Sequence, residues 1–361
     1  MLSKRYEDDG RPTYALNELQ LVTKRQIGEK IKQGIYRFES VPCCICQRSD
    51  FELLSRKDRY GLYMPVVICR YCGLIQTNPR MNQDSYSQFY RQEYRKLYNG
   101  VEIPTEGFFA VEYKRGRAIY DYLIRKNILP GLSLRPFVLE VGCSAGGILH
   151  YFREKGCRVK GVDLDEEYVQ YGRERHHLDL SVGTIHDVAL CDTPDIIIYA
   201  DVLEHILSPS SELIRVRQIL SGQGVLYVEL PGVKNLFPFY RDFIRLLQNA
   251  HTFHFSLATL VNLLELHGFR LVAGDEAIRS VFQKAEPSAH TVEIKNDYVS
   301  AMCYLKRWEK LRMFFPFPPG EFNQLPKVVT LNVLVKLLKL TRLYNFVAGI
   351  YHRLKSRGKP L

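Results

Sequence analysis

Residues 138–147 read Val138-Leu139-Glu140-Val141-Gly142-Cys143-Ser144-Ala145-Gly146-Gly147, a short apolar strand that runs into a loop of small residues. A helix is expected to begin at Ile148, directly after this loop. Asp163 stands 21 residues after Gly142, at the end of a second apolar run. Glycines let a backbone approach a ligand closely, and an acidic residue about 20 positions downstream can bind a ribose diol. The pattern predicts a nucleoside-cofactor site on a doubly wound α/β sheet.

Two details of this loop distinguish it from a site for a dinucleotide. The order Gly142-x-x-x-Gly146-Gly147 departs from the G-x-G-x-x-G spacing that cradles a pyrophosphate. Glu140 lies just before the loop and would repel a phosphate, whereas its carboxylate suits a positively charged cofactor such as S-adenosylmethionine (SAM). The alternative interpretation is an ordinary strand-turn-helix unit that holds no cofactor.

The stretch resembles motif I of the class I SAM-dependent methyltransferases, E-x-G-x-G-x-G, with Ser144 in place of the middle glycine. The resemblance continues in order along the chain, through the family's second to fifth strands. These segments are 161–165, 182–187 (the end of the third strand), 195–201 and 224–231, with two final strands expected near 270–273 and 280–284. The residues after the fourth strand, Val202 to Pro209, are close to the V-L-E-H-V-x-D-P signature of one large methyltransferase branch.

The resemblance implies an α/β fold with a Rossmann-like, doubly wound sheet of seven strands. It implies that Asp163 binds both ribose hydroxyls and that Thr184 and Ile185 contact the adenine. The expected cofactor-binding residues are Glu140, Gly142, Cys143, Ser144, Gly146, Asp163, Leu164, Thr184, Ile185, Ala200 and Asp201.

Two C-x-x-C knuckles lie upstream, Cys43-x-x-Cys46 and Cys69-x-x-Cys72-Gly73, with 22 residues between them. Each knuckle places two thiolates on one side of a tight turn, and together they offer the four sulfur ligands that Zn²⁺ prefers. The pattern predicts a structural zinc site. Two disulfides are the alternative, but the other cysteines after the knuckles are scattered singly and no secretion signal precedes them.

Two knuckles ahead of a SAM-binding region resemble the zinc-binding domain of sugar C-methyltransferases and of polysaccharide-cluster methyltransferases. The match includes residues 69–79 with the aromatic residues Phe89, Tyr90 and Tyr94, and it extends over roughly residues 31–284. The larger sugar C-methyltransferases carry a further C-terminal α/β domain. That domain is not expected here, because nothing after Glu286 alternates strands with glycine loops.

Length and composition fit one full domain with appendages: 361 residues, 46% of them apolar, and no stretch long and apolar enough to cross a membrane. We expect five segments along the chain. They are a helical leader (1–37), a zinc-binding knuckle domain (38–82), an aromatic-rich helical linker or lid (83–130), the SAM-binding domain (131–286) and a helical, basic C-terminal extension (287–361).

The C-terminal extension carries much of the net charge of +11: residues 321–361 hold eight Lys or Arg and one acid, a net +7. Apolar residues recur at helical spacing from Leu331 to Leu354. Such a basic amphipathic helix can lie on an anionic membrane, or it can pack on its own protein with a solvated basic face. Nucleic acid is not expected as a partner, because no RNA-binding module is recognised. The predicted location is the cytoplasm, with peripheral contact at the inner face of the membrane.

Three histidines are candidates for a general base: His205, on the turn after the fourth strand, and His251 and His254, after the fifth. Ligands bind at the carboxyl ends of the strands in such sheets, where these residues are expected. A purely structural role is the alternative for each. Eight aromatic residues between Tyr86 and Tyr113 are expected to pack in the core or to form a lid over the acceptor.

The sequence therefore predicts a SAM-dependent methyltransferase with a structural zinc site. Its expected acceptor is a sugar or a surface-polysaccharide (glycolipid) precursor. Methylation of a quinone, lipid or other small metabolite is the first alternative, since V-L-E-H loops also occur there. A non-catalytic binding protein with the same fold is the second. The acceptor atom and the oligomeric state do not follow from the sequence.

Overall fold

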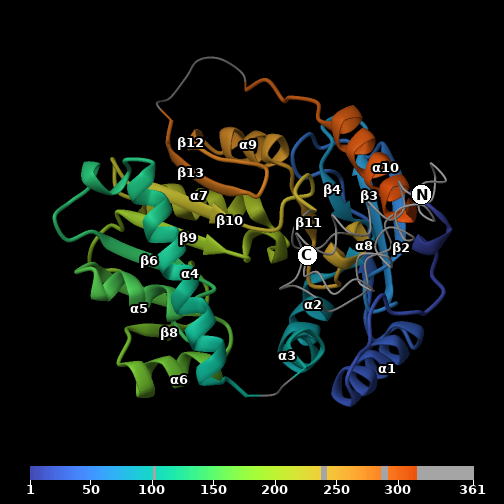
Figure 1. Cartoon of the computed structure of the whole chain (residues 1–361), viewed down its shortest axis with the longest axis horizontal. Coiled ribbons are helices and arrows are strands. Elements are labelled where there is room, and N and C mark those ends of the chain that lie inside the picture. Colours follow the sequence, from blue (N-terminus) through green and yellow to red (C-terminus); the bar gives the residue numbers. More distant parts are fainter. Residues whose placement is uncertain (101–102, 237–241, 286–291, 315–361) are drawn as a thin grey trace, which may run out of the picture. The chain divides into compact units, whose positions relative to one another are not determined.

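The computed structural model describes residues 1–100, 103–236, 242–285 and 292–314 (Figure 1). The chain divides into two compact units, residues 1–307 and 308–361. The second unit contributes only the last turns of helix α10 (Tyr298–Phe314) to the described residues. The tail segment predicted to form a basic helix, residues 331–354, lies outside them. No helix in the described part of the chain is long and apolar enough to cross a membrane.

A seven-stranded sheet forms the larger part of the first unit, in the order β12-β13-β10-β9-β6-β7-β8. The strands from β10 to β8 run parallel, whereas β13 is antiparallel to both of its neighbours. The bounds are β6 (Phe137–Val141), β7 (Arg158–Asp163), β8 (Leu180–Val182), β9 (Ile196–Ala200), β10 (Val225–Glu229), β12 (Phe269–Ala273) and β13 (Arg279–Lys284). This is the predicted doubly wound sheet, and the prediction is confirmed.

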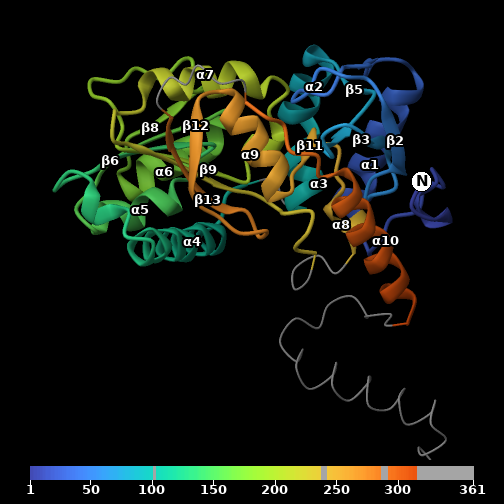
Figure 2. The ribbon, with the colours of Figure 1, turned by 90° about the horizontal axis from the view of Figure 1, so that it is seen from above.

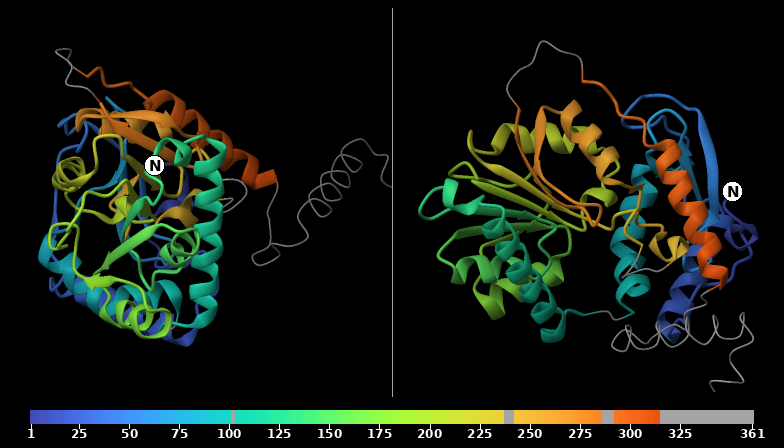
Figure 3. Two further views of the ribbon diagram at one scale, coloured as in Figure 1. Left: turned by 90° about the vertical axis from the view of Figure 1, so that its left-hand side faces the viewer. Right: turned by 45° about the horizontal axis from the view of Figure 1, so that its top comes forward.

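Continuous apolar runs form the central strands because helices cover both faces of the sheet (Figures 2 and 3). Every residue of β6 and of β9 is buried. Leu139 and Val141 belong to one core cluster, with residues of α7 and α9, and Val138 belongs to another, with residues of α4 and α5. The helices are α4 (Glu106–Arg125), α5 (Gly147–Glu154), α6 (Glu166–His176), α7 (Pro209–Ile219) and α9 (Leu257–Leu266).

A second, antiparallel sheet of four strands has the order β11-β4-β3-β2. Three of these strands belong to the cysteine-knuckle region: β2 (Phe51–Lys57), β3 (Tyr63–Cys69) and β4 (Ile75–Thr77). The fourth, β11 (Phe253–His254), comes from the segment that follows β10, and it pairs with β4 (Figure 1). The N-terminal sheet is therefore completed by residues of the SAM-binding segment.

Short elements connect and flank the two sheets. Three consecutive helical segments, α2 (Gln83–Phe89), the π-helical turn η2 (Tyr90–Tyr94) and α3 (Arg95–Asn99), carry most of the aromatic residues predicted as core or lid. The remaining elements are η1 (Lys4–Tyr6), α1 (Glu18–Lys32), β1 (Phe38–Glu39), β5 (Arg80–Met81), η3 (Leu129–Gly131), η4 (Leu203–His205) and α8 (Phe243–Leu246).

Candidate active site and cysteine cluster

The loop after β6 turns sharply back toward α5. Gly142, Ser144 and Gly146 all have positive φ, of 71°, 50° and 78°. A Cβ atom at Gly142 would lie 2.4 Å from Cγ2 of Val202, so this position accepts no side chain without movement. Ser144 adopts the left-handed conformation that favours glycine, at the place where the methyltransferase motif usually has one.

Asp163 ends β7 directly beside this loop. Its Oδ2 atom accepts a hydrogen bond from the backbone N–H of Ser144 (2.8 Å), and its Oδ1 atom accepts one from that of Asp165 (2.8 Å). Burial raises the pKa of Asp163, and the nearby Arg95 guanidinium opposes this shift. The acid predicted to bind a ribose and the glycine loop therefore meet at the carboxyl edge of the sheet.

Glu140 is buried in β6, 2% exposed, and its Oε2 atom has no hydrogen-bond partner. Burial, followed by the charge of the neighbouring Glu112, raises the pKa of Glu140 well above its ordinary value. The hydroxyl of Ser144 is also buried without a partner. A buried carboxylate in this condition favours a cationic ligand.

The other predicted cofactor residues also lie at the carboxyl ends of the parallel strands. Cys143 is buried and Leu164 is 63% exposed. Thr184, after β8, donates its hydroxyl hydrogen to Asp187 (2.7 Å), whereas the side chain of Ile185 is fully buried in the core. Ala200 ends β9 in a buried position.

Asp201, the last predicted cofactor residue, pairs with Arg115 of α4. The distance from Nη1 of Arg115 to Oδ2 of Asp201 is 2.9 Å, and Nη2 lies 3.0 Å from Oε1 of Glu229. Arg115 therefore links the carboxyl ends of β9 and β10. Sequence reasoning missed this residue, because no local motif marks it.

The three candidate base histidines gather in one buried cluster. His205, His251 and His254 are 7%, 3% and 2% exposed. The ring centroids of His205 and His251 are 4.7 Å apart, and those of His251 and His254 are 5.6 Å apart. Burial lowers the pKa of His205 to about 4 and that of His254 to about 3, and it also lowers the pKa of His251. All three imidazoles are therefore neutral at physiological pH.

Glu204 joins this cluster and was not among the predicted site residues, although it belongs to the same Leu-Glu-His segment as His205. Its side chain is 1% exposed, and neither carboxylate oxygen has a hydrogen-bond partner. Burial raises its pKa well above the ordinary value. The sequence offered one signal for Glu204 as a site residue: an ionisable side chain directly beside the candidate base His205.

Tyrosines of η2 and α3 lead from the surface to His205. The rings of Tyr90 and Tyr94 stack at 4.3 Å, and those of Tyr94 and Tyr98 stack at 5.6 Å. Tyr98 is 43% exposed, while Tyr90 and Tyr94 meet the His205 ring edge-on at 5.9 and 5.8 Å. In contrast, Tyr86 and Phe89 are buried, so part of the aromatic stretch packs in the core, and a lid over the acceptor stays a prediction for the rest.

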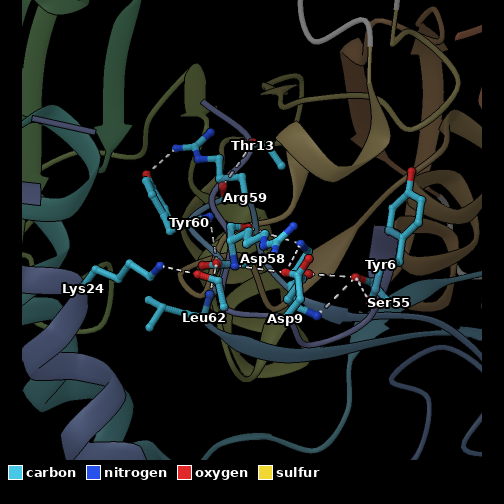
Figure 4. A network of polar contacts seen from close by, with 12 residues as sticks. Tyr6, Asp9, Thr13, Lys24, Ser55, Asp58, Arg59, Tyr60 and Leu62 are labelled. Atoms are coloured by element: carbon cyan, nitrogen blue, oxygen red, sulfur yellow. Dashed lines mark hydrogen bonds and ion pairs between the residues drawn. The ribbon is translucent and has the colours of Figure 1, made fainter. Parts of the chain in front are cut away.

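Residues of the N-terminal sheet hold the segment that carries His251 and His254. Asp58 accepts a hydrogen bond from the side-chain amide of Asn249 (2.9 Å). Arg59 donates to Oε1 of Gln248 (2.9 Å), and Gln248 in turn bonds to His251. Figure 4 shows Asp58 and Arg59 within their polar network. Thr77 of β4 donates its hydroxyl hydrogen to the carbonyl of His251 (2.9 Å).

The four knuckle cysteines lie together as free thiols. The Sγ atoms of Cys43 and Cys72 are 3.4 Å apart, as are those of Cys46 and Cys69, and all four lie within 4.8 Å of one another. A disulfide requires about 2.05 Å, whereas sulfurs at about 2.3 Å from a tetrahedral zinc are about 3.8 Å apart. Hydrogen bonds from Cys43 and then Cys72 lower the pKa of Cys69, which favours a thiolate there. The set fits zinc and not two disulfides.

Both knuckles end in a residue with left-handed backbone. Gly73 has φ of 81°, as its position predicts, and Gln47 takes the same conformation after the first knuckle, with φ of 58°. A fifth thiol, Cys44, lies outside the cluster of four.

Comparison with known proteins gives a consistent result. Residues 114–273 match the model of a family described as a methyltransferase domain. The chain is 24% identical over 240 residues to the C-methyltransferase NovU of Streptomyces niveus, which covers 64% of this chain and 53% of that protein. It is 27% identical over 106 residues to the ubiquinone biosynthesis O-methyltransferase of Pasteurella multocida, covering 25% and 44%.

Among solved structures, a SAM-dependent methyltransferase from Clostridium acetobutylicum is similar with a TM-score of 0.38 and 11% identity, over 56% of this chain and 99% of that one. This chain spans about half the length of the curated relatives it matches. The family match covers the segment that forms α5 to α9 and the parallel strands beside the glycine loop. The chain therefore contains a methyltransferase domain of the class I SAM-dependent family.

Proposed function

We propose that the protein transfers a methyl group from SAM to a sugar or a surface-polysaccharide (glycolipid) precursor, with a histidine as general base. The observation that carries the proposal is the buried, partly unpartnered carboxylate of Glu140 beside the glycine loop and Asp163. When bound, SAM supplies an activated methyl group on a sulfonium. Glu140 offers negative charge to a cationic cofactor, and each Asp163 oxygen retains a lone pair for a ribose hydroxyl.

The histidine cluster offers unprotonated imidazoles for the removal of a proton from the acceptor. A general base must be unprotonated before it acts, and the lowered pKa values of His205, His251 and His254 keep all three neutral. The same lowering makes each a weaker base than an ordinary histidine, so the proposal relies on close alignment of the acceptor with the imidazole. His205 is the best placed of the three, because its ring lies against the stacked tyrosines Tyr90 and Tyr94. A positioned base contributes about 10²–10⁴-fold to the rate, and alignment of the acceptor contributes further.

The substrate class rests on two supports. Tyrosine faces stack on sugar rings and their hydroxyls reach sugar oxygens, and the ladder formed by Tyr90, Tyr94 and Tyr98 offers both. The cysteine knuckles ahead of the domain resemble those of sugar methyltransferases, and one relative is named a C-methyltransferase. We propose structural zinc at Cys43, Cys46, Cys69 and Cys72, where it would fix the ends of β3 and β4.

A second candidate function is methylation of a quinone or another small metabolite. The relative named as a ubiquinone biosynthesis O-methyltransferase favours it. Radiolabelled SAM offered with sugar-nucleotide acceptors and, separately, with catechol acceptors distinguishes the two. Label transfer to catechols alone contradicts the sugar assignment.

Asp163→Ala tests the cofactor site. Loss of hydrogen bonds between the ribose and a charged group costs about 1.5–3 kcal/mol each, so SAM should bind at least about 10-fold more weakly, as measured by titration calorimetry. Asp179→Ala is the matched control, because its side chain is 62% exposed and, within the described residues, forms an ion pair only with Lys160 of β7. Equal SAM affinity of the Asp163 variant and the parent would place the cofactor elsewhere.

A further inference from the structure

Glu204, His205 and His251 bring one carboxylate and two imidazoles together in the interior. The two histidine Nε2 atoms lie 3.8 Å (His205) and 3.9 Å (His251) from Oε1 of Glu204. One ligand atom from each of the three residues lies within 4.8 Å of the others. We propose that these side chains bind a divalent transition-metal ion, at a site distinct from the cysteine cluster.

The distances between the ligand atoms suit such an ion if the three side chains move slightly closer together. Nitrogen and oxygen ligands about 2.1 Å from a tetrahedral metal are about 3.4 Å apart. The two distances to Glu204 exceed this by about 0.4–0.5 Å, which side-chain rotation can supply. Two imidazoles and one carboxylate are the ligand set that holds iron, zinc and similar ions while leaving positions open for a substrate.

Glu204 supplies the second, independent argument. A buried carboxylate without hydrogen bonds is strongly disfavoured, yet both of its oxygens lack a partner. The described residues offer it no Lys or Arg within ion-pair distance, only the two histidines. A metal cation would satisfy this carboxylate, whereas no protein group does.

The surroundings of His251 resemble the outer shell of metal sites, in which a ligating imidazole bonds a backbone carbonyl through its other nitrogen. His251 bonds the carbonyl of Leu246, whereas Nδ1 of His205 has no hydrogen-bond partner. Arg59 donates a hydrogen bond to the side-chain amide oxygen of Gln248, so the amide nitrogen of Gln248 faces His251. Because that nitrogen is a donor, the Nε2 atom of His251 accepts the bond and carries a lone pair. The metal would replace this amide at Nε2.

A divalent ion on two neutral imidazoles and one carboxylate leaves a net charge of +1. The rings of Tyr90 and Tyr94 lie against His205, so that charge would face the space proposed for the acceptor. It would attract an acceptor oxygen and stabilise its deprotonated form. In the metal-bound form His205 and His251 are ligands, so neither of them would act as the general base. This role of the metal rests on the proposed function, but metal binding itself does not.

Cobalt loading of the full-length protein tests the site. We expect two Co²⁺ ions per chain by elemental analysis. Thiolate-bound cobalt gives an intense charge-transfer absorption that nitrogen and oxygen ligands do not give. The absorption should therefore saturate after one equivalent while bound metal rises to two. Glu204→Gln should bind one ion per chain and keep the full thiolate spectrum.

Glu212→Gln is the matched control. Glu212 is a buried carboxylate on α7, 6% exposed, and it accepts a hydrogen bond from the Tyr199 hydroxyl (2.7 Å) outside the cluster. This variant should still bind two ions. If the melting curve shows that Glu204→Gln does not fold, His251→Ala removes a different ligand of the same site and should also bind one ion per chain. One ion per chain in the parent, or two in both ligand variants, would overturn the proposal without bearing on methyl transfer.

Discussion

Asp58 is a carboxylate with no exposed surface, at the turn between β2 and β3. Its Oδ1 atom accepts hydrogen bonds from the backbone N–H groups of Tyr60 and Leu62, both at 2.9 Å, and its Oδ2 atom accepts one from Asn249. Burial raises the pKa of Asp58 to about 6, because these hydrogen bonds offset the desolvation only in part. The turn that supports Asn249 and Gln248 is therefore sensitive to pH.

A raised pKa means that the folded protein takes up a proton on Asp58 more readily than the unfolded chain does. The contribution of Asp58 to stability is most favourable below pH 3.8, falls as the pH rises to about 6, and stays unfavourable above it. The shift corresponds to about 3 kcal/mol. Asp58→Asn keeps an acceptor for both backbone N–H groups and carries no charge, and its amide nitrogen would donate to Asn249 once the Asn249 amide turns over to present its oxygen. It should stabilise the protein at pH 7.5 by up to this amount and give no gain at pH 4.

Urea unfolding at the two pH values measures this difference. Asp50→Asn provides the control, since the Asp50 side chain is 73% exposed and its replacement should change little at either pH. A gain for Asp58→Asn that is the same at both pH values would show that the buried charge is not its cause.

At the scale of elements, α4 and α5 approach each other through glycines. A Cβ atom at Gly116 of α4 would lie 2.7 Å from the carbonyl oxygen of Ile148, and one at Gly147 of α5 would lie 2.7 Å from that of Phe109. The first turn of α5 follows the glycine loop, so the close crossing of these helices positions the proposed cofactor site.

Gly116→Ala should destabilise the protein by about 1–3 kcal/mol and weaken SAM binding, because the helices must separate. Gly107→Ala on the same helix is the control. The nearest atom to a Cβ there is the hydroxyl of Thr105, 3.9 Å away, and alanine favours helix, so this variant should be neutral or slightly stabilised. Melting curves and SAM titrations of both variants make the measurement. Equal melting temperatures of Gly116→Ala and the parent would show that the contact between α4 and α5 tolerates a methyl group.

The pairing of β11 with β4 links the cysteine cluster to His254. Ile75, three residues after Cys72, pairs with His254 in this ladder. Cys72→Ser should therefore speed hydrogen exchange at Phe253 and His254 as well as in the knuckles, while β6 and β9 stay protected. Exchange measured by mass spectrometry tests this, and the serine variant leaves any metal at Glu204 in place, unlike a chelator. Unchanged protection of residues 253–254 would show that the cysteine cluster does not stabilise β11, which carries His254.

The parallel strands were predictable because their signal is local. The uninterrupted apolar run 195–201 predicts a buried strand, and β9 is Ile196–Ala200. The thiol cluster was predictable for the same reason, since each knuckle sets its own geometry. β11 was not, because a two-residue strand has no periodicity and its pairing depends on residues far away in the chain. The contacts from Asp58 and Arg59 to the 248–251 segment escaped prediction for that reason too.

For the whole molecule, the basic tail is the main feature outside the described residues. We predict that residues 331–354 carry the protein to anionic vesicles, because the net charge of +7 in residues 321–361 accompanies apolar residues at helical spacing. Binding should weaken as salt rises. Removal of residues from Leu325 onward should abolish co-sedimentation with vesicles and leave SAM affinity unchanged. If truncation lowers the melting temperature by many degrees and neither the full chain nor the truncated protein sediments with vesicles, the tail packs on its own protein and stabilises the fold.

The late arrival of β11 has a consequence for synthesis on the ribosome. The edge of β4 remains without its partner until residues 253–254 have been translated. At 5–20 residues per second, that interval is roughly 9–35 s, during which the unpaired edge of a strand whose three residues are buried in the folded protein is exposed to other nascent chains. Rapid capture of metal by the four thiols would hold β3 and β4 together in the meantime. Cells starved of zinc should accumulate this protein as aggregates formed during translation.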